Sequence, residues 1–402
     1  MENLSFLTRK IKTAALETIC IAALLANNIS CIENVFGDTE TRPINPIPVG
    51  INWTGWNKDR LETKDAKVID KISADRYYDV AINPCYEQNS TVSSSIDSVP
   101  SMSYEYMREL VKDASSKNLN ITIKPLINAK SQGSDQTSRS YFSPKNIDEW
   151  FEDYTRIYLN LYHNILDSAK AQSRDIDINI GTEIDSILYK YPERFDRLID
   201  TLHSAGFQGR TTYSIEFASE LDTSKIHLLN NIKVDYIGID FYVSMHKLYS
   251  KKHDKRDVID AEGNIARQED YVVDEGPYEV LYYFNKILAS ASKPVKFTEA
   301  GVRSIEHGHR WPNFDSRIKG NADNYVQLKW YQNWVAALKL ASSQRMDIIG
   351  TDFWITDNSD ITEDIYHADS TGYSYFRKPA EKAIKKYILE LNSSKTQNDI
   401  KK

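Results

Sequence analysis

Two glutamates stand where short apolar runs of the sequence stop. Glu183 follows the run Asp177–Thr182, and Glu299 follows Pro294–Thr298 much later in the chain. Both runs have the pattern of a short strand and end in a Thr-Glu pair. Carboxylates at the carboxyl ends of strands are the usual acid–base groups of barrel enzymes. Two of them are what glycoside hydrolysis requires, one as proton donor and one as nucleophile or base. The alternative is that each glutamate caps the next helix.

The rest of the chain alternates strand-like runs with helical patterns, which is typical of βα units around a parallel sheet. Expected strands lie at 49–53, 78–84, 120–128, 177–183, 210–215, 234–242, 294–299 and 347–354. Expected helices lie from residue 103 and at 147–166, 192–206, 278–288, 325–334 and 378–391. The count of βα units predicts an α/β fold, a single (β/α)8 TIM barrel with a short N-terminal extension. The charged stretch 246–275 is expected as a surface loop with a hairpin turn at 260–264.

Three segments are expected: an N-terminal extension at 1–45, the barrel at 46–392 and a polar tail at 393–402. In the extension, basic residues between Arg9 and Lys12 precede an apolar run at 13–26 that is too short to cross a membrane as a helix. This pattern, followed by a polar linker, favours export of the protein, either secreted or membrane-attached. An amphipathic helix on a cytoplasmic protein is the alternative.

Composition excludes several classes of function. The 402 residues carry a net charge of −7 with scattered basic residues, so nucleic acid is not an expected partner. Three cysteines without CxxC spacing give neither a disulfide framework nor a zinc site. His307 and His309 lack a third metal ligand, and the acidic stretch 357–364 lacks the spaced glycine of a calcium loop. We therefore expect neither a metal nor another cofactor.

Several short motifs, taken in order, resemble glycoside hydrolase family 113, which holds β-mannanase-like barrels of the retaining clan A. They are ITIKPLIN (121–128), WFEDY (150–154), IGTE (180–183), VDYIGID (234–240), FTEAG (297–301) and KPAE (378–381). The resemblance covers roughly 48–390 and extends to the barrel domain of gene-transfer-agent tail proteins. It implies that Glu183 is the acid/base, that Glu299 is the nucleophile and that no cofactor is needed.

Two residues depart from this family's pattern. Thr182 stands where the clan usually has an asparagine directed at the sugar 2-hydroxyl, and Leu126 stands where the family often has histidine. Both positions lie at the expected binding face. We expect another strand-end residue to replace the missing contact, with Asn83, Lys124 and Asn128 as the candidates.

Other residues at strand ends are candidates for contact with substrate. The resemblance places an aromatic floor under the sugar at Trp354, with a core tryptophan as the alternative. Trp53 and Tyr242 have the same two interpretations. For Asn83 and Lys124, a hydrogen bond to substrate and a buried polar interaction are both open.

The expected function is that of a retaining glycoside hydrolase acting on a β-linked poly- or oligosaccharide, with β-mannan-like substrates favoured. The alternative is a non-catalytic barrel that binds glycan or serves as a structural module, because a barrel can lose its catalytic activity and keep its fold. A metal-dependent barrel hydrolase would need clustered His and Asp ligands at strand ends, which the sequence does not offer.

Overall fold

The computed structural model describes residues 47–54, 66–130, 139–167, 176–259, 265–310, 312, 320–355 and 373–400. Contacts group Asn45–Lys402 into one compact unit. The expected N-terminal extension, the turn at 260–264 and the acidic stretch 357–364 lie outside the described residues. In the described part of the chain, no helix is both long and apolar enough to cross a membrane.

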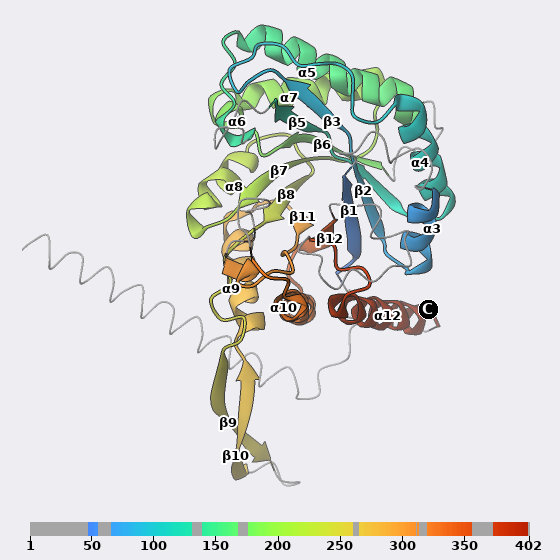
Figure 1. The fold of residues 1–402 in the computed structure, drawn as a ribbon. Helices are drawn as coiled ribbons and strands as arrows, with labels where there is room; N and C mark the ends of the chain where they lie inside the picture. The colour runs from blue at the N-terminus through green and yellow to red at the C-terminus, as the bar shows by residue number, and fades with distance from the viewer. Residues whose placement is uncertain are drawn as a thin grey trace, which may run out of the picture. The chain divides into compact units, whose positions relative to one another are not determined.

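Eight parallel strands close into a barrel in the order β1-β12-β11-β8-β7-β6-β4-β2 (Figure 1). The strands are β1 (Val49–Thr54), β2 (Asp79–Asn83), β4 (Asn120–Ile123), β6 (Ile176–Thr182), β7 (Thr211–Phe217), β8 (Tyr236–Phe241), β11 (Val295–Ala300) and β12 (Ile348–Ile355). Each overlaps one of the eight expected runs. The predicted TIM barrel is therefore confirmed.

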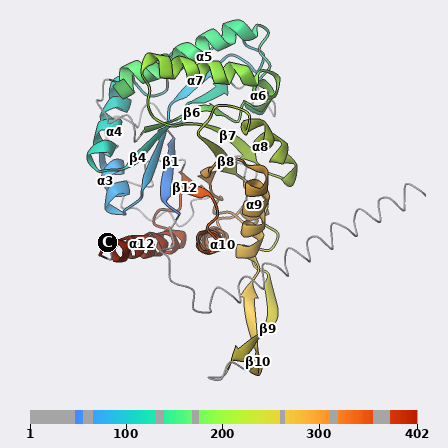
Figure 2. The ribbon, with the colours of Figure 1, turned by 180° about the vertical axis from the view of Figure 1, so that it is seen from behind.

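Helices surround the barrel, as the views from both sides show (Figures 1 and 2). They are α3 (Ala66–Ala74), α4 (Tyr104–Ser116), α5 (Ile147–Leu161), α6 (Asp185–Lys190), α7 (Pro192–Ala205), α8 (Thr223–Leu229), α9 (Gly276–Ser290), α10 (Asn324–Ser343) and α12 (Pro379–Ile400). Short helical turns are η2 (Arg139–Tyr141), the π-helical η3 (Tyr162–Asp167), η5 (Glu220–Asp222) and η6 (Gly308–Arg310). The closing helix α12 continues past residue 392, where the polar tail was expected to begin.

Helix α5 illustrates how sequence fixes the outer layer. The Asn146 side chain accepts hydrogen bonds from the amides of Asp148 and Glu149, which caps the first turn. Apolar side chains then recur at helical spacing and are buried: Trp150, Phe151, Tyr154, Ile157, Tyr158 and Leu161. Because this face packs on the barrel, the strands beneath it are buried on both sides.

The expected strand at 120–128 is divided in two. Lys124 and Pro125 separate β4 from β5 (Leu126–Ala129), which pairs in parallel with β3 (Cys85–Gln88) as a second small sheet. Proline has no N–H for a sheet hydrogen bond, and Pro84 interrupts the neighbouring strand at the same level. The break sets Lys124 apart at the carboxyl end of the barrel strand.

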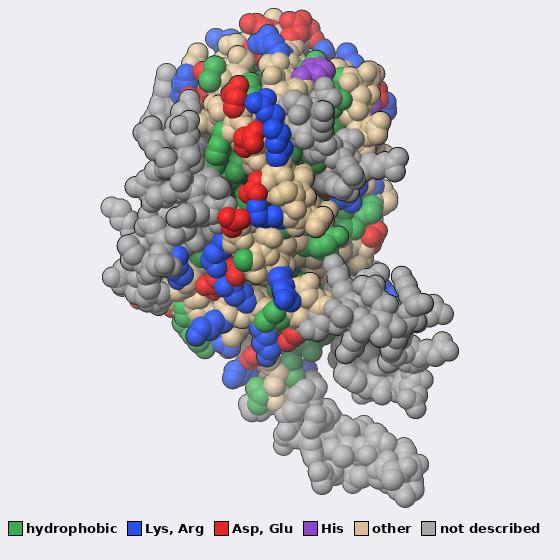
Figure 3. Space-filling model, turned by 90° about the vertical axis from the view of Figure 1, so that its right-hand side faces the viewer, with side chains coloured by type: hydrophobic (Ala, Val, Ile, Leu, Met, Phe, Trp, Pro, Cys, Tyr) green, Lys and Arg blue, Asp and Glu red, His purple; other side chains and the backbone are tan. Residues whose placement is uncertain are grey.

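The stretch 246–275 differs from the expected surface loop, and that prediction is wrong for most of its length. It forms an antiparallel ribbon of β9 (Lys251–Ile259) and β10 (Ile265–Asp274) that extends away from the barrel (Figures 1 and 2). The alternation of apolar and polar residues that marks a half-buried strand is missing from the sequence here. Elsewhere on the surface, Figure 3 shows Lys and Arg interspersed with Asp and Glu on the face in view.

Candidate active site

Glu299 lies in β11 opposite Asp240 of β8, just after an irregularity in their pairing. Phe297 is in register with Ile239, and Glu299 with Asp240, so one residue of β11 is skipped between them. Such bulges re-aim side chains, and they are common beside active sites. The skipped residue, Thr298, is held in place because its carbonyl accepts a 2.6 Å hydrogen bond from the Asn52 side chain. Glu299 is buried.

Glu183 directly follows β6, where the pairing with β7 also slips between Asn179 and Thr182. Its backbone has φ +55°, a left-handed conformation that is uncommon for a residue other than glycine. The Glu183 amide donates to the Ser214 carbonyl at 2.9 Å, which holds this turn against the neighbouring strand. Strained backbone of this kind tends to occur at functional sites.

Helix α5 stabilises the irregular part of β6 from outside. The Tyr158 hydroxyl donates to the Asn179 carbonyl at 2.8 Å, and the Tyr154 hydroxyl donates to the Ile180 carbonyl at 2.9 Å. The Asn179 side chain also accepts from the Gly181 amide at 3.0 Å. Backbone groups freed by the slip are therefore satisfied, and the position of Glu183 is fixed by neighbouring elements.

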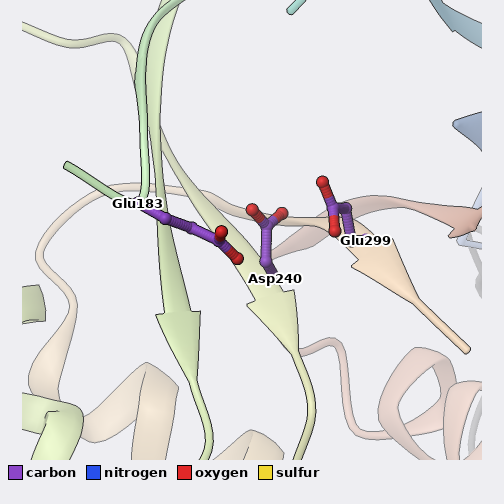
Figure 4. A group of neighbouring side chains, drawn as sticks. All are labelled: Glu183, Asp240 and Glu299. Atoms are coloured by element: carbon purple, nitrogen blue, oxygen red, sulfur yellow. The ribbon is translucent and has the colours of Figure 1, made fainter. Parts of the chain in front are cut away.

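The two glutamates face one another across a third carboxylate. Figure 4 shows Glu183 and Glu299 directed toward each other from different strands, with Asp240 between them. One oxygen from each of the three lies within 4.8 Å of the others. Asp240 is not among the site residues predicted from the sequence. Its position at the end of a strand, like that of the two glutamates, was the signal available.

Lys124 reaches into this cluster from the break after β4. Its ammonium group donates to Asp240 Oδ1 at 2.8 Å and to Glu299 Oε1 at 2.5 Å, and its side chain is completely buried. Of the two open interpretations, the described geometry is that of the buried salt bridge. Carboxylate oxygens are ligands that hard cations prefer, but here an ammonium group already lies among them and supplies positive charge.

Arg139 provides the second positive charge. Its guanidinium donates to Glu183 Oε2 at 2.6 Å and to Asn128 Oδ1 at 3.2 Å. The next residue, Ser140, also donates from its hydroxyl to the Glu183 carbonyl at 3.3 Å. Arg139 is not among the predicted site residues, because it lies in a polar connection with no periodic pattern.

These two positive charges and burial shift the pKa values of the three carboxyl groups in different directions. Burial by itself raises the pKa of Glu183, but the Arg139 guanidinium outweighs burial and holds that pKa below its ordinary value. Burial raises the pKa of Glu299 despite the opposing Lys124 charge. Burial and the Glu299 charge raise the pKa of Asp240 well above its ordinary value. A proton taken up by the cluster is therefore held on the Asp240–Glu299 side in preference to Glu183.

An apolar group separate from the main core contains one residue that contacts Glu299. It consists of Cys85, Leu126, Tyr242, Trp354 and Tyr373. The Tyr242 hydroxyl donates to Glu299 Oε2 at 2.6 Å, so this tyrosine lies directly against the predicted nucleophile. The expected floor residue Trp354 belongs to the same group. Trp53, in contrast, is packed within the main hydrophobic core.

The remaining predicted contacts are buried polar residues. The Asn83 side chain donates to the side-chain oxygen of Asn52, which in turn holds the bulge at Thr298. The Thr182 hydroxyl donates to the Pro125 carbonyl at 3.3 Å. Both groups thus have partners within the protein. Their contact with substrate stays a prediction.

A closed parallel barrel with carboxylates gathered at the carboxyl ends of its strands is the architecture of the TIM-barrel glycosidases. Residues 51–346 match the model of Glycoside Hydrolase Family 113, and the chain belongs to this family.

Solved structures of the same family share the fold. A GH113 β-1,4-mannanase, described in a complex structure, is 19% identical with a TM-score of 0.61, covering 87% of this chain and 99% of that one. The GH113 β-mannanase of Alicyclobacillus acidocaldarius in complex with ManMIm is 13% identical with a TM-score of 0.61, covering 88% and 99%. At these identities the likeness extends to the fold alone. No curated protein matches the sequence.

Proposed function

We propose that this protein is a retaining glycoside hydrolase that cleaves a β-linked poly- or oligosaccharide, with β-mannan-like substrates favoured. The observation that carries the proposal is the approach of Glu183 and Glu299 from the ends of β6 and β11, with carboxylate oxygens within 4.8 Å. Retaining enzymes keep their two carboxyl groups about 5–5.5 Å apart, whereas inverting enzymes separate them by about 6.5–9.5 Å to admit a water molecule. The short separation favours retention.

In the proposed mechanism, Glu299 attacks the anomeric carbon while Glu183 gives a proton to the leaving glycosidic oxygen. A covalent glycosyl-enzyme forms as the glycosidic bond breaks. Glu183, now ionised, then removes a proton from a water molecule, which displaces Glu299 and releases the sugar with its original anomeric configuration.

The hydrogen bonds around Glu299 support its role as nucleophile, whereas those around Glu183 support the base of the second step and oppose the acid of the first. The Glu299 carboxylate is stabilised by Lys124 on one oxygen and by the Tyr242 hydroxyl on the other. Arg139 stabilises ionised Glu183, which suits the base of the second step. The first step needs a protonated Glu183. Because Arg139 lowers the pKa of Glu183, this contact sets the pH above which the first step slows.

Two variants test the assignment. Glu299→Ala removes the nucleophile and should abolish turnover of every substrate. Glu183→Ala should still form the glycosyl-enzyme from dinitrophenyl glycosides, whose leaving group needs little protonation, and azide should restore its second step with formation of a glycosyl azide. Equal loss of Glu183→Ala activity on activated and unactivated glycosides would contradict the acid/base role. NMR of the first product formed should show the β-anomer, and the α-anomer would exclude retention.

One observation favours the alternative of a non-catalytic glycan-binding barrel. The Thr182 hydroxyl is bound to the Pro125 carbonyl, at the position where the clan usually directs an asparagine at the sugar. A panel of aryl β-glycosides and soluble β-glycans distinguishes the two functions. Hydrolysis by the unmodified protein that is lost in Glu299→Ala supports the glycoside hydrolase. If the unmodified protein binds glycan without hydrolysing it, the non-catalytic binding barrel is supported.

A further inference from the structure

We propose that Tyr249 and Tyr325 form a second glycan-binding platform on the catalytic rim, which takes a pyranose unit of a neutral β-linked glycan chain. The inference rests on the proposed function, because it supplies a remote contact for the same polymeric substrate. Neither residue belongs to the group of side chains around the carboxylates.

The two rings are exposed and parallel. Their centroids lie 5.8 Å apart with an angle of 10° between the planes. Tyr249 is 45% exposed and Tyr325 is 55% exposed, whereas most other aromatic pairs of the barrel are buried. Two parallel exposed rings present a flat apolar surface to a ligand. The apolar C–H faces of a sugar ring fit such a surface, and the tyrosine hydroxyls remain available to sugar hydroxyls.

The position of the platform connects it with the candidate active site. Tyr249 lies on the segment that leaves β8, the strand of Asp240. Tyr325 lies in the first turn of α10, on the segment that leaves β11, the strand of Glu299. Both segments start at the carboxyl rim, where barrel enzymes bind their substrates. They are joined to each other, since the Met245 amide donates to the His309 carbonyl at 2.9 Å.

Neighbouring side chains hold the two tyrosine rings in place and put a negative charge beside them. The His309 ring meets Tyr249 edge-on, with centroids 5.7 Å apart and an angle of 84°. The Asp323 carboxylate accepts hydrogen bonds from the Tyr325 amide at 2.9 Å and the Val326 amide at 3.2 Å. Burial and the Asp323 charge raise the pKa of Tyr249 to about 12, so its hydroxyl stays protonated and can donate to a sugar. A negative charge beside the rings disfavours acidic glycans and favours neutral ones.

The test measures binding to the full-length Glu299→Ala protein, in which substrate is not consumed. Affinity electrophoresis in gels containing soluble β-mannan should show about tenfold weaker binding after Tyr249→Ala or Tyr325→Ala. Tyr249→Phe and Tyr325→Phe should retain most of the binding, because the rings remain. Tyr78→Ala is the matched control, since Tyr78 is 43% exposed and precedes β2 at the opposite end of the barrel.

The same substitutions in the active protein should raise KM for the polymer and leave kcat/KM for a small aryl glycoside unchanged. Unchanged thermal unfolding temperatures would show that the variants fold. Equal binding of β-mannan by the parent and both alanine variants would overturn the platform while leaving the proposed function intact. Failure of the Glu299→Ala parent to bind any of a panel of neutral β-glycans, together with absence of hydrolysis by the unmodified protein, would overturn both.

Discussion

The ammonium nitrogen of Lys124 lies 2.5 Å from Oε1 of Glu299, and both side chains are buried. The same nitrogen lies 2.8 Å from Oδ1 of Asp240. Lys124 is therefore an internal counter-ion for two carboxyl groups from adjacent strands. Without it, neighbouring negative charges would remain in a site shielded from water, where uncompensated charge is strongly unfavourable.

Replacement of Lys124 by methionine should destabilise the protein. Breaking a buried ion pair by removing one partner costs about 3–5 kcal/mol, so the free energy of unfolding should fall by that amount in urea denaturation at neutral pH. Adding Asp240→Asn should restore part of the stability, because one of the two stranded carboxylates is then neutral. Lys112→Met, which breaks an exposed pair with Glu109, serves as control. Equal stability of Lys124→Met and the parent would contradict the role of counter-ion.

Replacement of Arg139 by glutamine should move the basic limb of the pH profile. Arg139 lowers the pKa of Glu183, so its removal raises that pKa. An acid/base catalyst must be protonated for the first step, and activity is therefore lost as pH rises through its pKa. The basic limb of kcat/KM on an unactivated glycoside should shift to higher pH. Arg156→Gln, at an exposed pair with Asp153, should leave the profile in place. An unmoved or lowered limb in Arg139→Gln would disprove this coupling.

Asp352 should make stability depend on pH. Burial, against the opposing charge of Lys296, raises its pKa to about 7, while Lys296 Nζ lies 2.9 Å from Asp352 and 3.2 Å from Asp79. The folded state thus binds this proton more tightly than the unfolded state, whose pKa is about 3.9. The contribution of Asp352 to stability is fully present below about pH 4 and is lost as pH rises to about 7.

Asp352→Asn should therefore gain stability relative to the parent as the pH rises from about 4 to about 7. Urea denaturation at several pH values measures this difference. Asp200→Asn, at an exposed pair with Lys233, provides the comparison. Parallel curves for Asp352→Asn and the parent would show that the group does not titrate in this range.

Two glycines beside the glutamates should respond differently to alanine. A Cβ at Gly181 would lie 2.2 Å from the ring of Tyr213, whereas a Cβ at Gly301 would find its nearest atom at 3.5 Å, an ordinary contact. Gly181→Ala must displace the segment that leads to Glu183, so kcat/KM should fall at least about tenfold with lower thermal stability. Gly301→Ala should change both by little. A Gly181→Ala protein with parental kinetics would show that Glu183 tolerates movement of its strand.

The sequence by itself determined the barrel and the two strand ends that carry Glu183 and Glu299. Both depend on local patterns, namely the alternation of apolar runs with amphipathic helices and the Thr-Glu pairs that follow two of those runs. The breaks at Pro84 and Pro125 were also readable in principle, since proline removes a backbone donor wherever it stands. The boundary of the N-terminal extension stays a prediction.

Only the tertiary structure decided which charges surround those glutamates. Lys124, Arg139 and Asp240 come from three separate connections or strands, and no local pattern relates them to Glu183 or Glu299. The slips in register before both glutamates likewise arise from pairing between strands and cannot be read from either strand alone. Trp53 and Trp354 look alike as strand-end tryptophans, yet Trp53 packs in the main core and Trp354 joins the smaller apolar group that contains Tyr242, the partner of Glu299. The physical reason is that burial and ion pairing depend on which surfaces the closed barrel brings together, whereas periodicity depends only on neighbours along the chain.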